Sequence, residues 1–106
     1  MSIKTADLTA QNTFSDWIKP IKRGSSGFDS EGFLDIMTSG TWAGTLTVQK
    51  RHFHGTPAVY TDPYDVEDFT ANLTKLIEDR STTVEYRIGF KTGNYTSGTA
   101  AVRLEQ

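Results

Sequence analysis

The feature that most limits the possible folds is strict alternation of apolar and polar residues from Val84 to Lys91. Val84, Tyr86, Ile88 and Phe90 occupy every second position, and charged residues or glycine fill the positions between them. Successive side chains of a β-strand point to opposite faces of a sheet, so this pattern indicates a strand with one apolar face. The segment is therefore predicted to be a core strand.

A second strand is predicted from Trp42 to Gln49. Trp42, Gly44, Leu46 and Val48 share one face, and threonine dominates the other. We expect Trp42 to fill the core and Gly44 to leave room for a neighbouring ring or backbone, which is a usual role of glycine in a strand. The threonine-rich face is predicted to pair or pack with another copy of the chain.

The last strand is predicted from the alternation of Ala100, Val102 and Leu104 with their neighbours. Segment 93–98, with the sequence GNYTSG, is predicted to be a turn because glycine, asparagine and serine are typical turn residues. The last strand and the strand before this turn are therefore predicted to form an antiparallel hairpin.

A shorter strand is predicted immediately after a glycine- and serine-rich loop at 22–32. Leu34 and Ile36 share one parity and are expected in the core. Phe33 and Met37 then lie on the outer face, where two apolar side chains together can seed an interface.

Residues 65–79 allow two alternatives. Five apolar residues match the stripe of a helix, namely Val66, Phe69, Leu73, Leu76 and Ile77. The competing prediction is two short strands, 67–71 and 74–79, joined by a tight Asn-Leu turn, and the alternating, threonine-rich neighbours favour it. Val59 or Tyr60 is expected to point inward from a further short strand.

Short strands at intervals of about 10–15 residues, separated by turn residues, are typical of a sandwich or barrel. The predicted fold is all-β, an antiparallel β-sandwich of jelly-roll or Ig-like type. A chain of 106 residues fits one domain, predicted at 14–106, with 1–13 as an N-terminal arm or weak first strand. The predicted core contains Trp42, Leu46, Val48, Tyr86, Ile88, Phe90, Val102 and Leu104.

The composition argues against several classes of protein. A formal net charge of −2 at pH 7 makes nucleic acid an unexpected partner. The chain has no cysteine, and therefore no disulfide, thiolate nucleophile or cysteine zinc site. No apolar run approaches the length of a membrane helix, and the first residues lack the apolar segment of a secretory signal. Synthesis and folding in the cytoplasm are expected, with no membrane partner.

The sequence contains no motif of a nucleotide-binding loop or a catalytic serine elbow. His52 and His54 would share one face of a strand but lack a third ligand with suitable spacing, which favours an ordinary charged rim over a metal site. The acidic stretch 62–68 lacks the spacing of a calcium loop. We therefore expect a binding or structural module, with no catalytic residues, no metal and no cofactor.

Several aromatic residues could line a sugar-binding platform, although aromatic residues of small β-domains are more often part of the core. These are Trp17, Trp42, Tyr60, Tyr64 and Tyr95. The three tyrosines lie in predicted loops or at strand ends, so they are the better candidates for a ligand or an interface.

Three stretches together resemble small virion proteins of tailed bacteriophages. They are SGTWAGTLTVQKR, TANLTKLIED and the C-terminal VEYRIGFKTGNYTSGTAAVRLEQ, and the similarity covers Gly32 to Gln106. The family pattern has a Gly-Thr-Trp-x-Gly-Thr strand, a Tyr-Arg-x-Gly/Ala strand and a turn ending in Tyr-Thr-Ser-Gly. The stretch HFHGTPAVYTDPYD departs from it, where a short glycine-rich hairpin is expected, so a special contact could lie in this insert.

The resemblance implies a β-sandwich, the strand alternative for Phe69–Asp79, and a role on the virion surface. The best match is a head decoration or cement protein that binds the outside of the capsid and bridges major capsid subunits. A tail or fibre module of a phage, or a carbohydrate- or protein-binding Ig-like domain, is the alternative. The expected partners are the major capsid protein and other copies of the chain, as a dimer or trimer. Interface roles are predicted for Phe14, Phe33, Met37, Phe53 and Tyr64.

Overall fold

The computed structural model describes residues 3–22, 32–79, 81 and 83–106. These residues form ten strands, which are β1 (Ile3–Leu8), β2 (Thr13–Phe14), β3 (Ile21–Lys22), β4 (Gly32–Ser39), β5 (Trp42–His54), β6 (Val59–Tyr60), β7 (Tyr64–Phe69), β8 (Thr74–Asp79), β9 (Val84–Gly98) and β10 (Ala100–Glu105). A search of this described part of the chain finds no helix with the length and apolar character needed to cross a membrane.

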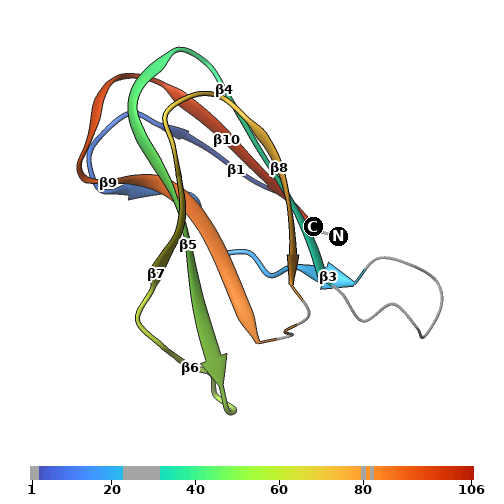
Figure 1. The fold of residues 1–106 in the computed structure, drawn as a ribbon. Coiled ribbons are helices and arrows are strands. Elements are labelled where there is room, and N and C mark those ends of the chain that lie inside the picture. The colour runs from blue at the N-terminus through green and yellow to red at the C-terminus, as the bar shows by residue number, and fades with distance from the viewer. Residues whose placement is uncertain (1–2, 23–31, 80, 82) are drawn as a thin grey trace.

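The strands form two antiparallel sheets that pack face to face (Figure 1). Sheet A has the order β1-β10-β4-β8, and sheet B has the order β2-β9-β5-β7. The short β3 adds to β4 in sheet A, and the short β6 adds to β5 beside β7. This arrangement confirms the predicted antiparallel β-sandwich. Of the two alternatives for the N-terminal segment, an arm or a first strand, residues 3–8 form the strand β1.

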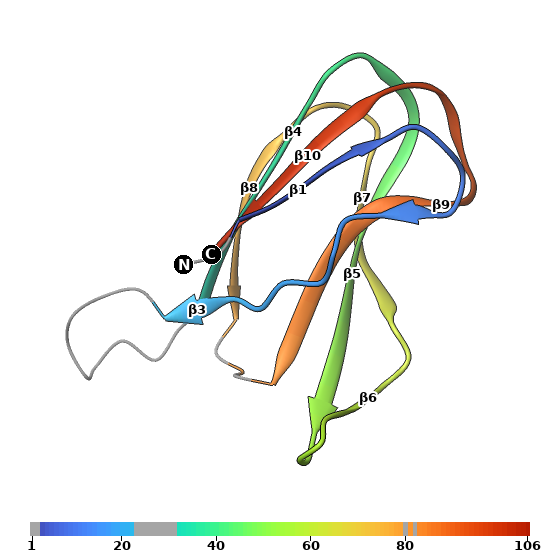
Figure 2. The same ribbon diagram turned by 180° about the vertical axis from the view of Figure 1, so that it is seen from behind.

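The strand pairs are nested along the chain. β1 pairs with β10, β2 with β9, β4 with β8 and β5 with β7, so the chain folds as one long double ribbon. Its closed end is the β5–β7 connection, which carries β6 and projects as a hairpin beyond the sandwich (Figure 2). This nesting is the jelly-roll arrangement of two four-stranded sheets. Because Ile3 pairs with Glu105, both ends of the ribbon lie at one corner, away from that hairpin (Figure 1).

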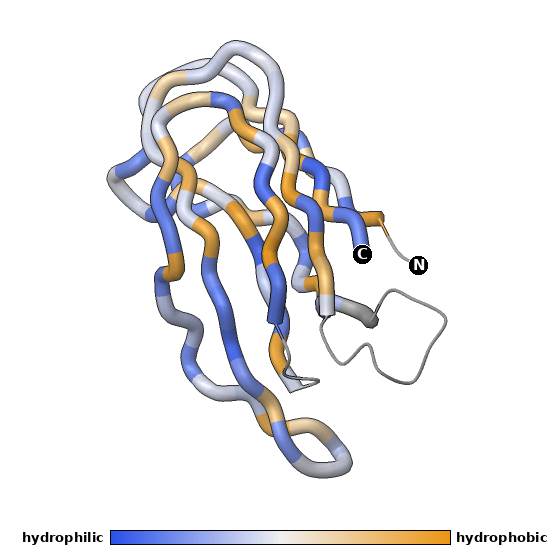
Figure 3. Tube along the Cα trace, turned by 45° about the vertical axis from the view of Figure 1, so that its right-hand side comes forward, coloured by the Kyte–Doolittle hydropathy of each residue, from blue (hydrophilic) through white to orange (hydrophobic). Residues whose placement is uncertain are grey.

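The core lies between the inner faces of the two sheets, and apolar and polar positions alternate along the strands that line it (Figure 3). The buried apolar side chains are Leu8, Ile18, Leu34, Ile36, Leu46, Val48, Ile77, Val84, Tyr86, Ile88, Phe90, Ala100, Val102 and Leu104. All predicted core residues are among them except Trp42, which is half-buried. Its ring meets the edge of Phe90 at 5.7 Å, and its indole nitrogen donates a hydrogen bond to Asn72 at 2.7 Å. Trp42 therefore closes the rim of the core instead of filling its centre.

Gly44 has the role expected of it. Its φ angle is 138°, in a region that other residues rarely adopt, and the pairing of β5 with β9 shifts register on both sides of it. A Cβ atom at this position would collide with the carbonyl oxygen of Asn94. Glycine is therefore required here by the close approach of a neighbouring backbone.

The predicted hairpin between the last two strands is wrong. β9 pairs with β5 in sheet B, whereas β10 pairs with β1 and β4 in sheet A. Segment 93–98 is no turn but the second half of β9, which pairs with 42–44. The side chain of Gln11 supports it, since its Oε1 accepts hydrogen bonds from the backbone N–H groups of Gly93 and Tyr95. Alternation indicates which face is buried, but not which strand is the partner.

Two further predictions need correction. Residues 65–79 form strands as expected, but β7 and β8 lie in different sheets, so their connection crosses the sandwich and is no tight hairpin turn. Val59 and Tyr60 do not point inward, because β6 lies beyond the edge of the sandwich and leaves them 55% and 47% exposed. On the threonine-rich face of β5, Thr47 is fully buried within the chain and donates a hydrogen bond to Asp68 at 2.7 Å.

Candidate interaction surfaces

A row of stacked aromatic rings and guanidinium groups crosses the outer face of sheet B. The guanidinium carbon of Arg87 lies 4.0 Å from the ring centre of Phe14 and 4.5 Å from that of Trp17. The guanidinium carbon of Arg51 lies 4.2 Å from the ring centre of Trp17 and 3.8 Å from that of Tyr60. Rings and cations alternate along these five residues, which we name the cation–π ladder. A single contact of this kind stabilises by about 0.5–1 kcal/mol at an exposed site.

The pairing of β5 with β9 explains why the two arginines lie side by side. Arg51 and Arg87 have the parity opposite to the apolar core residues of their strands, so both side chains point outward. In the register of the two strands, Arg51 lies opposite Glu85 and Arg87 lies opposite Gln49. The three rings come from β2, from the segment that follows it and from β6. Three regions that are distant in the sequence, 14–17, 51–60 and the part of β9 around Arg87, therefore build one surface.

Hydrogen bonds hold both guanidinium groups in place. Arg51 donates from Nε and Nη2 to Oε1 of Glu85 at 2.9 and 2.7 Å. Arg87 donates from the same two nitrogens to Oε1 of Gln49 at 2.9 and 2.8 Å. The ladder is thus ordered before any partner arrives, which lowers the entropic cost of binding.

The network continues from the ladder to the edge strand β7. The amide of Gln49 donates to Asp65 at 3.1 Å, and Lys91 forms an ion pair with the same carboxylate at 2.5 Å. The hydrogen bonds from Lys91 and Gln49 lower the pKa of Asp65. Non-covalent contacts between side chains therefore run across the outer face of sheet B from β2 to β7.

The two arginines differ in their charge environment. Arg51 has a carboxylate partner in Glu85, whereas Arg87 is bound to the neutral side chain of Gln49 and to two rings. Burial, and then repulsion from Arg51, lower the pKa of Arg87. In the described ranges 3–22, 32–79, 81 and 83–106, no carboxylate contacts Arg87.

Two of the predicted interface residues belong to this face. Phe14 is the first ring of the ladder. Phe53 lies beside Tyr60, the last ring of the ladder, and the centroids of these two rings are 5.7 Å apart. The ammonium group of Lys19 lies 4.9 Å from the ring centre of Phe53. The aromatic surface thus extends onto the projecting hairpin.

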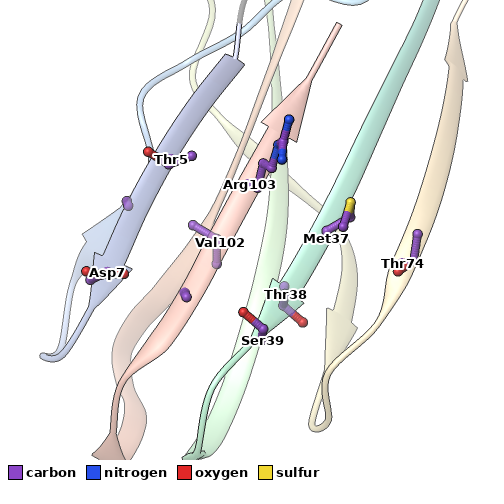
Figure 4. Close-up of a pocket in the computed structure, with 10 residues that line it drawn as sticks. Thr5, Asp7, Met37, Thr38, Ser39, Thr74, Val102 and Arg103 are labelled. Carbon is purple, nitrogen blue, oxygen red and sulfur yellow. The ribbon is translucent and has the colours of Figure 1, made fainter.

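The outer face of sheet A carries a shallow trough, which encloses about 570 Å³. It is lined by Thr5, Ala6, Asp7, Met37, Thr38, Ser39, Thr74, Ala101, Val102 and Arg103. Figure 4 shows one row of these side chains crossing all four strands, with Arg103 and Met37 at its centre. The small side chain of Ala101 leaves the hollow beside them.

The predicted interface residues Phe33 and Met37 both lie on this outer face of sheet A, as their parity indicated. Met37 is 42% exposed, and Ile3 and Leu76 on the flanking strands are exposed to a similar extent. The ion pair of Arg103 with its own-strand neighbour Glu105, at 3.3 Å, is wide and exposed. The trough therefore combines the apolar Met37 and the charged Arg103 at its centre with threonine, serine and aspartate side chains around them.

Tyr64, the fifth predicted interface residue, lies on a third surface at the base of the hairpin. Its ring stacks on His52 with centroids 5.9 Å apart, and its hydroxyl lies 3.0 Å from Nε2 of that histidine. His52 and His54 do not gather acidic residues around them, and the part of the chain that the structure describes has no group of three or more potential metal ligands. The five predicted residues thus fall on three surfaces and form no single site.

A polar cluster between the sheets is the main buried ionic feature. Lys50 and the hydroxyl of Tyr86 both donate to Oδ2 of Asp79 at 2.6 Å, and the backbone N–H of Ser81 donates to its other oxygen at 2.9 Å. Burial works against the charge of Asp79, but these hydrogen bonds outweigh it and lower the pKa of that carboxylate. Burial, followed by the hydrogen bond to Asp79, raises the pKa of Tyr86 to about 12. The cluster ties β8 of sheet A to β5 and β9 of sheet B.

The residues that the sequence did not identify as a site are Trp17, Arg51 and Arg87. Trp17 was considered for a sugar platform, but both of its neighbours in the ladder are cations. The outward parity of the two arginines was available from the alternation. Their adjacency was not, because it depends on β5 and β9 being neighbours in one sheet.

Comparison with family models, with curated proteins and with solved structures finds no match to this chain.

Proposed function

We propose that this chain is a capsid decoration protein of a tailed bacteriophage, which binds the outside of the head and bridges neighbouring major capsid subunits. The resemblance of its strands to phage virion proteins suggests the class. The observation that supports a bridging role is that one small sandwich carries two chemically different surfaces on opposite faces. These are the cation–π ladder on sheet B and the trough on sheet A, which combines an exposed methionine with mostly small polar side chains.

Two opposed surfaces suit a cement protein for a physical reason. A bridge must hold two neighbours at a fixed separation, and a jelly roll with a continuous core is a stiff spacer. Repetition of the bridge over a closed shell turns individually weak contacts into a large stabilisation, because later contacts form at high effective concentration. Copies of the chain are proposed to associate with one another on the shell as dimers or trimers, as symmetric parts commonly do.

The test uses purified protein and heads of the phage that encodes it, prepared without this protein. We expect saturable co-sedimentation with the heads and a higher temperature of head disruption after binding. Met37→Glu places a charge in the trough and is expected to reduce the thermal protection of the heads. Thr92→Glu, at an exposed position of β9 away from the trough, is the matched control.

Two outcomes would reject the decoration role. One is the absence of binding to any form of the head. The other is binding to purified tails instead of heads, which would assign the chain to the alternative class of tail or fibre modules. Binding to heads without any thermal protection would remove the bridging function while leaving the location intact.

A further inference from the structure

We propose that the cation–π ladder is a docking surface for an acidic segment of a partner protein, and that one carboxylate of the partner pairs with Arg87. The identity of the partner as a capsid subunit depends on the proposed function. The chemistry of the site does not, because it follows from the contacts within the ladder.

The first argument is an imbalance of charge. Two guanidinium groups lie beside one ring, and the described residues supply a carboxylate to only one of them, Arg51. Arg87 is partly buried and is repelled by Arg51. A charged group in this position gains more from an added opposite charge than an exposed one does, because solvent screens it less.

The second argument is order. Arg87 is held between the rings of Phe14 and Trp17, and its Nε and Nη2 are fixed by Gln49. Its Nη1 makes none of these bonds, so one edge of the guanidinium group keeps donor capacity. A partner oxygen can therefore bind without immobilising a flexible side chain, a cost of about 0.5–1.5 kcal/mol in other interfaces.

The third argument is the type of residue. Tryptophan, tyrosine and arginine are the residues that most often dominate binding energy at protein interfaces. The ladder contains all three, and Tyr60 remains 47% exposed at its end. The rings offer apolar area around the charged centre, which excludes water from the new ion pair.

The surroundings favour a protein carboxylate over nucleic acid. Glu85 and Asp65 lie on the same face, and the chain as a whole has a formal net charge of −2. A polyphosphate backbone would meet these carboxylates within a few ångströms of the arginines. A peptide can direct one carboxylate at Arg87 and turn its other acidic side chains away from them, whereas the closely spaced charges of a polyphosphate backbone cannot.

The chemistry can be tested without a virion. The ¹⁵N-labelled protein is titrated with the tripeptide acetyl-Glu-Glu-Glu-amide, and the resonances of the Arg87 Nε–H and the Trp17 indole N–H are followed. We expect both to shift saturably. In Arg87→Gln the Trp17 shift should be lost, and in Gln49→Glu, which supplies an internal carboxylate, both shifts should fall at least about fivefold.

Lys75→Gln is the matched control, since it removes one positive charge from the sheet edge, away from the ladder. This variant should bind the tripeptide like the wild type. Unresponsive resonances in the wild type, or an unchanged Trp17 shift in Arg87→Gln, would overturn the proposal. A stronger response to an oligothymidylate of equal charge would overturn it in favour of nucleic acid.

The same variants connect the ladder to the capsid. Arg87→Gln and Gln49→Glu are expected to weaken binding to heads by about tenfold or more, as loss of a charged partner at an interface does, whereas Lys75→Gln should not. If heads bind all variants equally, the ladder is not the docking surface, although the decoration role stands. If the wild type binds no heads but the tripeptide still binds at Arg87, the decoration role fails and the docking chemistry stands.

Discussion

The two outer faces of the sandwich are both built from strands with alternating residues, yet they differ in how firmly their side chains are held. On sheet B, the ion pair of Arg51 with Glu85 is 2.7 Å long, with side chains only 20% and 13% exposed. On sheet A, the pair of Arg103 with Glu105 is 3.3 Å long, with side chains 45% and 28% exposed. The first face is a pre-formed surface and the second is an adaptable one.

The difference arises from what the rest of the chain brings to each face. β2, the segment after it and β6 place three rings against the arginines of sheet B. The centre of the sheet A trough has Met37 and the small Ala101 instead. The outer face of sheet B is therefore expected to contribute more to the stability of the fold than the trough does.

The largest expected effect comes from removing the central ring of the ladder. Trp17→Ala should lower the free energy of unfolding by about 3 kcal/mol, because it removes a half-buried ring and two cation–π contacts. Met37→Ala in the trough should cost less than about 1 kcal/mol. Urea denaturation at pH 7 measures both, and equal losses would show that the two faces are not different in kind.

The next effect concerns the cluster that keeps the two faces at a fixed separation. The pKa of Tyr86 is raised from 10.0 to about 12, so its contribution to stability is complete below pH 10 and is lost as the pH rises to about 12. We expect a loss of roughly 2 kcal/mol over this range. The raised pKa of Lys50 acts in the same direction.

At acid pH the sign is reversed for Asp79. The folded pKa of Asp79 lies below the ordinary value of 3.8, so its contribution to stability is present above that value and disappears as the pH falls further. Unfolding curves collected across pH measure both limbs. Tyr86→Phe should flatten the alkaline limb, and an unchanged alkaline limb would assign it to other groups.

A smaller effect compares the two ion pairs directly. A double-mutant cycle on Arg51 and Glu85 should give a coupling energy of about 1 kcal/mol, since both side chains are mostly buried and share two hydrogen bonds. The same cycle on Arg103 and Glu105 should give about 0.3 kcal/mol or less. Coupling of similar size in both pairs would contradict the contrast drawn between the faces.

The smallest effect is expected from the exposed apolar side chains on the edge strands of sheet A. Ile3→Gln and Leu76→Gln replace exposed side chains and should change the free energy of unfolding by no more than about 0.5 kcal/mol. Thermal denaturation measures this change. A loss above about 1 kcal/mol would show that these side chains stabilise the sheet and are not reserved for a partner.

The alternation of residues was sufficient to predict the layers of the fold. It placed Leu34, Ile36, Ile88 and Phe90 in the core, and it placed Met37 on an outer face, because side-chain direction is a local property of a strand. It could not predict strand partners, since these depend on how the whole ribbon wraps. The error at 93–98 has this origin, because a segment rich in turn residues continues as a strand where Gln11 hydrogen-bonds to it.

The candidate site was harder to predict for the same reason. Arg51 and Arg87 are 36 positions apart, and nothing in their local sequence shows that both guanidinium groups contact the ring of Trp17. Phe14 and Phe53 were predicted to belong to an interface, but the sequence did not indicate that they share one face. The structure adds the guanidinium groups that connect these regions into one surface.

The nested pairing of the strands also brings the first and the last described strand side by side. Because β1 and β10 are neighbours, a short linker could join Ile3 to Glu105 in an engineered variant, and the chain could be opened at the tip of the β5–β6 hairpin. A guest domain fused at the original corner would leave both outer faces clear. The chain could therefore serve as a scaffold in which the order of the strands keeps a fused domain away from both outer faces.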